Sequence, residues 1–503
     1  MAAVTATSCK KDFIALEPKD SYSAGTFFQN EDQLRQGVMA AYVPLRDLLV
    51  NDYFTSEMRS DNTIYQAYPS NRGTAYLYRE SISDFTNNPN NSYSNAVYFH
   101  SYKGISRANI VLGRINDVTL SPEAKADIEG QAKFIRAWNY FKLVRHFGGV
   151  PLFLKEVTKA DEAFLVRSTA EEVYAQLIAD AKDAITLLAP PAGFPQSGKA
   201  TKGAATMLLA EVYATQKKWA EAEALLNTLP AMGYALHANY ADVFSTANKN
   251  SKESIFEVQY LEGTAVGTAP NNFIYQFLPR TNSTELITGT KTNNGSTGGW
   301  NTPTKDLIDA YEANDKRLDA SIAIAEGAYN ASDLLVISAN KSIVNYIPGP
   351  GKTGVPYIKK YLNLPHQAPN NAGDNWPIYR YAGALLLLAE VQNEQGKSPF
   401  EALNAVRTRA GLPAVNESNQ AALRGIIAHE RRIELAFENH RWHDLQRTGK
   451  AVEVMNAFGT NLKQQVNYLS ADAYQVTPDK LLFPIPQSER ELNPALVQNP
   501  GYF

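Results

Sequence analysis

Hydrophobic residues recur at steps of three and four along much of the chain, which is the spacing of one face of an α-helix. This period predicts helices over residues 31–50, 92–117, 122–147, 169–189 and 419–438. Ser121 and Pro122 support the start of the third helix, because serine caps a helix N-terminus and proline fits the first helical position. The pattern therefore predicts a mainly α-helical protein.

The most apolar of these segments is KFIRAWNYFKLVRHFGGVPLF, residues 133–153. Phe134, Trp138 and Phe141 share one stripe of its helix, and further apolar residues occupy another. A helix that is apolar on more than one side is buried among other helices. The pair Gly148-Gly149 and the proline that follows then end it. We interpret this segment as a central core helix with a sharp exit.

Helical hairpins are predicted at two places far apart in the chain. Between Leu209 and Leu226, large, small and aromatic residues match the tetratricopeptide spacing. A second, partial copy begins at Leu388, with one extra residue in its turn and Gln392 where a tyrosine is expected. Small residues at such positions let two helices cross closely. The two matches predict a scaffold of tetratricopeptide-like helix pairs.

The residues between these hairpins differ from them in composition and in hydrophobic period. Residues 254–260, SIFEVQY, alternate like a strand, and residues 280–303 are polar and glycine-rich. Earlier in the chain, the tyrosine-rich segment 51–91 lacks a clear period and is interpreted as an ordered, functional loop. We expect a signal remnant and tether at 1–12 and one domain at 13–503. The domain consists of a helical scaffold (31–253 and 377–458), a loop-rich insertion with short strands (254–376) and a proline-punctuated tail (459–503).

The net charge, the lengths of the apolar runs and the cysteine count each argue against a class of protein or a structural feature. The formal net charge of -3 argues against a nucleic-acid binder, which needs a basic surface. There is no run of 18 apolar residues, so no membrane-spanning helix is predicted. A single cysteine, Cys9, excludes an internal disulfide.

Cys9 follows the small residues Ala6, Thr7 and Ser8, as the acylated cysteine of a bacterial lipoprotein signal does. The basic and long apolar regions of such a signal do not precede it. Either the start is mis-assigned or truncated, or Cys9 is incidental. We favour lipidation of Cys9.

The segment HERRIELAFENHRWHDL, residues 429–445, contains many groups that can act in catalysis or bind metal. His440 and His443 are three residues apart, as zinc ligands can be. The second histidine that a zinc-protease helix needs after His429 is missing. Interspersed arginines can pair with the carboxylates as two-pronged forks. We interpret the segment as a structural ion-pair network, with a metal site or acid–base catalysis as alternatives.

Aromatic side chains on polar loops are the remaining candidates for a binding site, and we expect them to be exposed. A sugar ring presents C–H groups to an aromatic face and hydroxyls to amides and guanidiniums, so such loops suit glycans. The predicted binding residues are Trp300, Tyr98, Tyr68, Tyr65, Tyr93, Asn71, Arg72 and Asn294. No catalytic residue, cofactor or metal ligand is predicted.

Four stretches resemble one known family. They are RAWNYFKLVRHFGGVPL (136–152), ERRIELAFENHRWHDLQRTG (430–449), LFPIPQSERELNPALVQNPGY (482–502) and the spacing of Tyr102, Ile105 and Asn109. In this order they resemble the SusD/RagB-like outer-membrane lipoproteins of Gram-negative, glycan-degrading bacteria. The resemblance implies tetratricopeptide-like helix pairs with an inserted, loop-rich binding region.

The resemblance also implies a function. Such proteins capture oligosaccharides at the cell surface, anchored in the outer membrane by a lipid and facing the exterior. They form a lid over a SusC-type TonB-dependent transporter and catalyse nothing. Peptide capture, as in RagB-like members, stays open as an alternative, and so do an enzyme that uses residues 429–445 and a purely structural partner module. The ligand itself does not follow from the resemblance.

Overall fold

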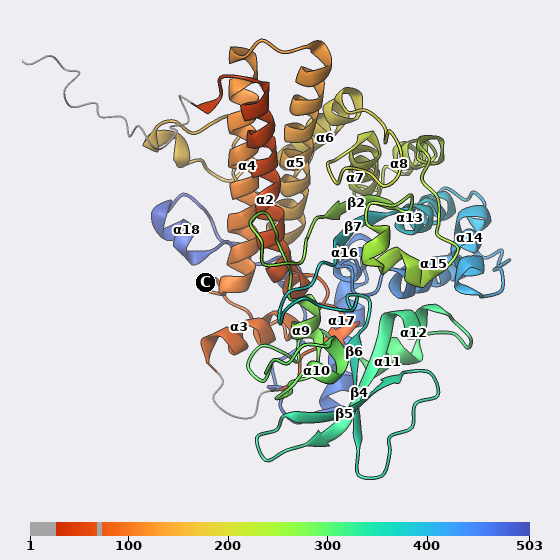
Figure 1. Ribbon diagram of the computed structural model, residues 1–503. Coiled ribbons are helices and arrows are strands. Elements are labelled where there is room, and N and C mark those ends of the chain that lie inside the picture. The colour runs from red at the N-terminus through yellow and green to blue at the C-terminus, as the bar shows by residue number, and fades with distance from the viewer. Residues whose placement is uncertain (1–26, 68–72, 503) are drawn as a thin grey trace, which may run out of the picture.

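The computed structural model describes residues 27–67 and 73–502. Three long helices, α2 (Glu31–Thr55), α4 (Ser92–Arg114) and α5 (Pro122–Phe147), stand side by side (Figure 1). Asn30, Asn91 and Ser121 cap their N-termini by accepting backbone N–H bonds. The predicted starts of these helices are therefore confirmed within a residue.

Helix α5 is the central core helix that its sequence predicts. Phe134, Phe141 and the other apolar side chains of both its stripes are buried. Gly148 ends it with a φ of 72°, in the left-handed region that favours glycine. A Cβ on Gly149 would lie 2.3 Å from the carbonyl oxygen of Ser168. The Gly-Gly pair thus allows the chain to pass close to the backbone that leads into α6 (Ala170–Leu187).

Helix pairs continue the scaffold to one side of these three helices (Figure 1). The hairpin α7 (Lys202–Thr215) and α8 (Trp219–Leu226) and the hairpin α13 (Tyr381–Glu394) and α14 (Phe400–Ala410) fall where the tetratricopeptide spacing predicts them. Helix α13 packs against α8, so the two hairpins are neighbours in space. The mainly helical fold class is confirmed.

A pair of antiparallel strands brings the two hairpins together. Strand β2 (Ser254–Val258) pairs with β7 (Trp376–Arg380), with Ser254 opposite Arg380. The long excursion between them therefore begins and ends at one point on the scaffold.

The excursion is built around a three-stranded antiparallel sheet in the order β5-β4-β6. Its central strand buries Ile322, Ala323, Ile324 and Ala325. Its elements are β4 (Ile322–Tyr329), β5 (Leu335–Ser342), β6 (Thr353–Ile358), α9 (Phe273–Phe277), α10 (Glu285–Thr288), α11 (Lys305–Asp309) and α12 (Arg317–Ser321). They occupy the lower part of Figure 1.

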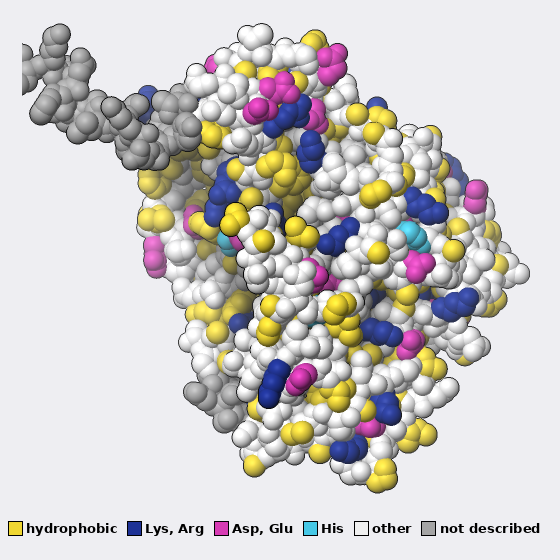
Figure 2. Space-filling view, viewed as in Figure 1, with side chains coloured by type: hydrophobic (Ala, Val, Ile, Leu, Met, Phe, Trp, Pro, Cys, Tyr) yellow, Lys and Arg dark blue, Asp and Glu magenta, His cyan; other side chains and the backbone are white. Residues whose placement is uncertain are grey.

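The C-terminal helices return to the scaffold. They are α15 (Gln420–Glu434), α16 (Arg441–Arg447), α17 (Ala451–Gln465) and α18 (Gln487–Leu492). Over the face shown in Figure 2, basic and acidic side chains are interspersed, as the near-balanced charge predicts. Among the residues that the structure describes, no helix combines the length and apolarity needed to cross a membrane.

Two predictions of secondary structure are wrong. Segment 51–91 is not one loop, because α2 runs to Thr55, β1 (Thr63–Ile64) pairs with β3 (Thr302–Pro303), and α3 (Thr74–Ser83) follows. Helix α15 also stops four residues before the predicted 438. The two segments meet in the fold, because the buried carboxylate of Glu57 accepts the backbone N–H groups of Phe437 and Asn439, at 2.9 Å each.

Candidate functional site

Those predicted binding residues that the structure describes do not form one exposed surface. Tyr68, Asn71, Arg72 and Cys9 lie outside the described residues. Of the others, the structure brings Trp300, Tyr65 and Tyr93 to one region, between the end of α2, α3 and the start of α4. Tyr98 and Asn294 lie in other parts of the fold, against Phe147 and Thr281 respectively.

Trp300 is not the exposed ring that its polar surroundings predict, because only 1% of its surface is accessible. Its backbone N–H bonds to the carbonyl of Gln276, and its ring packs against Phe54 at a centroid distance of 5.6 Å. Glycine-rich sequence around it indicated a solvent-exposed loop, but the glycines instead permit close packing. A Cβ on Gly298 would lie 2.9 Å from the carbonyl oxygen of Leu278.

Tyr65 and Tyr98 are also buried, against expectation. The Tyr65 hydroxyl donates to Asp84 at 2.9 Å. Burial raises the pKa of Tyr65, and the negative charge of Asp84 raises it further. Tyr98 packs against Tyr102 and, edge to face, against Phe147 of α5. Its ring belongs to the helical core, so the prediction that it is an exposed binding residue is wrong.

Asn294 holds its own loop together. Its side-chain oxygen accepts the N–H of Thr281 at 2.8 Å, and its amide donates to the carbonyls of Tyr275 and Pro279. The side chain is 1% exposed. Both amide hydrogens and the side-chain oxygen are engaged within the fold, which corrects its predicted role.

Three partly exposed side chains cover Trp300 instead, and we call Tyr76, Arg79 and Tyr93 the aromatic shelf. The Arg79 guanidinium carbon lies 4.7 Å from the ring centroid of Tyr93 and 4.8 Å from that of Trp300. Tyr76 tilts over Trp300 at 5.8 Å and donates its hydroxyl to the carbonyl of Ser296. A cation held between ring faces is stabilised by their quadrupoles.

The shelf has donor capacity left for a ligand. Arg79 makes no hydrogen bond or ion pair within the described part of the chain, and its Nε is buried. Tyr76 and Arg79 are three residues apart on α3, so they share one helix face. This signal was missed because 51–91 was interpreted as a loop, where helical spacing has no meaning.

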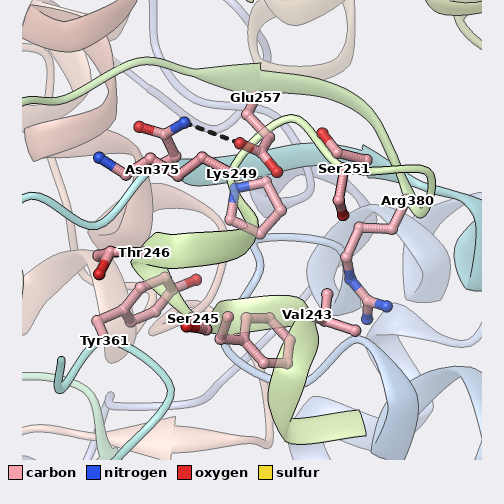
Figure 3. Close-up of a pocket in the computed structure, with 12 residues that line it drawn as sticks. Val243, Ser245, Thr246, Lys249, Ser251, Glu257, Tyr361, Asn375 and Arg380 are labelled. Carbon is pink, nitrogen blue, oxygen red and sulfur yellow. Dashed lines mark hydrogen bonds between the residues drawn. The ribbon is translucent and has the colours of Figure 1, made fainter. Parts of the chain in front are cut away.

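A second candidate is the hollow between η5 (Tyr240–Phe244), η6 (Thr246–Asn248), β2 and β7, shown in Figure 3. Two of its charged groups already have partners: Asn375 donates to Glu257 at 2.8 Å, and Lys249 donates to the carbonyl of Tyr260 at 3.0 Å. Burial raises the pKa of Glu257. The cavity measures about 20 Å³, which is space for a water molecule and not for a sugar ring.

The cluster at 429–445 is an ion-pair network, as predicted. Arg431 donates to Asp444 within the segment, but Glu434 and Glu438 take their partners from elsewhere in the chain. Glu434 accepts from Arg409 at 2.5 Å, from Arg380 at 3.0 Å and from Arg317 at 3.1 Å. Glu438 accepts from Arg380 and Lys360. Guanidiniums therefore occupy the carboxylate oxygens that a metal or a catalytic proton would need.

The two histidines do not change this conclusion. Burial lowers the pKa of His443 well below its usual range, and nearby Arg145 and Lys142 lower it further. Burial also lowers the pKa of His440. Within residues 27–67 and 73–502, no three His, Cys, Asp or Glu side chains gather as metal ligands.

Comparisons with known proteins agree with this non-catalytic geometry. A model of the SusD family matches residues 252–502, and one described as starch-binding proteins associating with the outer membrane matches residues 12–214. SusD-like protein P25 of Formosa agariphila is 28% identical over 98% of this chain and 97% of its own length. SusD-like protein P2 of the same organism is 30% identical over 84% of each chain. The chain belongs to the SusD family.

The solved structures of SusD-like proteins share the fold. A laminarin-binding SusD-like protein is 27% identical and superposes with a TM-score of 0.74, covering 94% of this chain and 100% of that one. SusD-family glycan-binding proteins are non-catalytic, so this SusD-family chain is not an enzyme. The family models also group it with proteins that associate with the outer membrane.

Proposed function

We propose that this SusD-family protein captures oligosaccharides at the cell surface and that the aromatic shelf contacts the sugar. The observation that carries the proposal is Arg79, a guanidinium held between the rings of Tyr93 and Trp300 with no hydrogen-bond acceptor among the described residues. Aromatic faces suit the apolar C–H face of a sugar, and guanidinium donors suit its hydroxyls. Laminarin binding by a relative with the same fold supports this ligand class.

The predicted roles of Tyr68, Asn71 and Arg72 belong to this proposal. These residues directly precede α3, the helix that carries Tyr76 and Arg79. We propose that they also bind the sugar, with a ring, an amide and a guanidinium.

Replacing Tyr76 or Arg79 with alanine is expected to weaken oligosaccharide binding at least tenfold, which corresponds to about 1.4 kcal/mol. The first change removes a ring face, and the second removes a guanidinium that has no acceptor among the described residues. Isothermal titration of the full chain against a panel of neutral oligosaccharides, including laminarihexaose, measures the loss.

A matched control for Tyr76→Ala is Tyr329→Ala, which removes another exposed tyrosine, on β4 and outside the shelf. The control variant should bind as the unaltered protein does. If no glycan binds, or if peptides bind in their place, capture of oligosaccharides is refuted and peptide capture takes its place.

We further propose that Cys9 is acylated, anchors the protein in the outer membrane facing outwards, and lets it pass ligand to a SusC-type TonB-dependent transporter. The support is the family membership and the small residues before Cys9. Cys9→Ser should abolish the lipid mass detected on the protein and move it out of the membrane fraction. A tagged chain should co-purify with the transporter; a protein that stays membrane-bound without Cys9 would contradict the anchor.

A further inference from the structure

A groove of about 680 Å³ lies on the scaffold, away from the shelf, between α13 and α15 on one side and α16 and the start of α17 on the other. Lys217 and Trp219, at the turn between α7 and α8, complete its wall. This volume is within the range of small-molecule sites, about 300–1,000 Å³. Apolar side chains, among them Leu445 and Val454, line much of it.

Most carboxylate oxygens in this groove are already occupied. Glu390 accepts both Nε and Nη2 of Arg447 at 2.8 Å, and Asp444 lies 2.7 Å from the Nη1 of Arg447 and accepts from Arg431 at 3.0 Å. These four side chains form a closed set on the groove's wall. A ligand therefore finds few free carboxylate oxygens there to accept its hydroxyl protons.

Donors, in contrast, remain available. Arg424 engages Glu394 through Nε and Nη2, and Arg441 engages Asp61 through the same two nitrogens, so each Nη1 is without an acceptor among the described residues. Lys217 is exposed and forms no ion pair in the described chain.

The side chains that line the groove carry a net positive charge. Six basic and four acidic side chains line the groove, a net charge of +2, whereas the whole chain carries -3. A site with spare donors, mostly occupied acceptors and a positive excess complements a ligand that is rich in acceptors and negatively charged. The partly exposed Trp219 adds an apolar face for a ring.

We propose that this groove is a second binding site, for an anionic oligosaccharide that carries carboxylate or sulfate groups. Lys217, Arg424 and Arg441 bind the anionic groups, and Trp219 contacts the sugar ring. The ligand class rests on the proposed function, but the site and its charge preference do not involve the shelf. A neutral glycan and an anionic one then bind at separate places on one protein.

The test is isothermal titration of the full chain with trigalacturonate, a sulfated disaccharide and neutral laminarihexaose. The double variant Lys217→Asn/Arg424→Gln removes two spare donors, and asparagine tolerates the φ of 58° at position 217. It should weaken binding of at least one of the two anionic ligands at least tenfold and leave laminarihexaose binding unchanged. Binding of the anionic ligand should also weaken as salt rises.

The control Lys305→Gln/Lys463→Gln removes two exposed lysines outside the groove and should change neither affinity. Tyr76→Ala should lose the neutral ligand and keep the anionic one, so failure of the shelf and failure of the groove give different results. The proposal is overturned if neither anionic oligosaccharide binds, if Tyr76→Ala abolishes their binding, or if a hexaglutamate peptide binds as tightly.

Discussion

Glu434→Ala is expected to lower the free energy of unfolding by about 3–5 kcal/mol, the cost of removing one partner from a buried ion pair. Glu434 is fully buried, and Arg317, Arg380 and Arg409 all donate to it. Without the carboxylate, their positive charges remain in the interior with fewer counter-charges. Denaturation of the variant in urea, followed by circular dichroism, measures the change.

The control is Lys305→Ala, which breaks the pair between Lys305 and Asp309 at a site where both side chains are more than half exposed. This change should cost less than about 1 kcal/mol, because water screens exposed pairs. Equal effects of the two changes would show that burial of the network does not determine its contribution.

The same network predicts how stability depends on pH. Burial alone raises the pKa of Glu434, but Arg409, Arg380 and Arg317 outweigh it and lower the pKa to about 2, from an ordinary value of 4.5. A lowered folded-state pKa stabilises the fold above the unfolded pKa, and this contribution is lost as the pH falls from about 4.5 towards 2. Glu434→Ala should show a shallower loss of stability over that window.

Trp300→Ala is expected to cost about 3–5 kcal/mol of stability, as a large-to-small change in a packed core does. The ring contacts Phe54, Tyr65 and Tyr76 and supports Arg79 from below. Oligosaccharide affinity should fall as well, because the shelf loses the ring on which Arg79 and Tyr76 rest. Thermal denaturation and titration of the same sample measure both effects.

The variant Trp300→Phe distinguishes a role of Trp300 in packing under the shelf from a direct contact between Trp300 and the sugar. It keeps a ring in the core but removes the indole Nε1, which has no hydrogen-bond partner in the described structure. We expect a smaller loss of stability than for alanine and nearly unchanged binding. If Trp300→Ala abolished binding at unchanged stability, Trp300 would be an exposed sugar platform after all, and the shelf would be assigned incorrectly.

Local periodicity was sufficient to predict the scaffold. The starts of α2, α4 and α5, the glycine end of α5 and both helical hairpins depend on contacts within a few turns of the same helix, so the linear pattern contains them. The prediction failed at 51–91 for a physical reason. The side chain of Glu57 is buried against Phe437 and Asn439, whose backbone N–H groups it accepts although they lie 380 and 382 residues away in the chain.

Exposure of the candidate site could not be predicted in the same way. Trp300 and Asn294 lie in a polar, glycine-rich stretch, yet both are 1% exposed. The glycines that suggested an open loop instead allow backbone to approach backbone, which depends on what packs against them and not on their own sequence.

Sequence alone thus determined the helical class, the sharp exit from α5, the ion-paired character of 429–445 and the resemblance to the SusD/RagB-like proteins. Only the tertiary structure decided which aromatic rings face solvent, which arginines hold Glu434, and that Tyr76, Arg79 and Tyr93 meet over Trp300. The physical reason is range: helix periods and caps act over a few residues, whereas burial and ion pairing depend on side chains that folding brings together from distant segments.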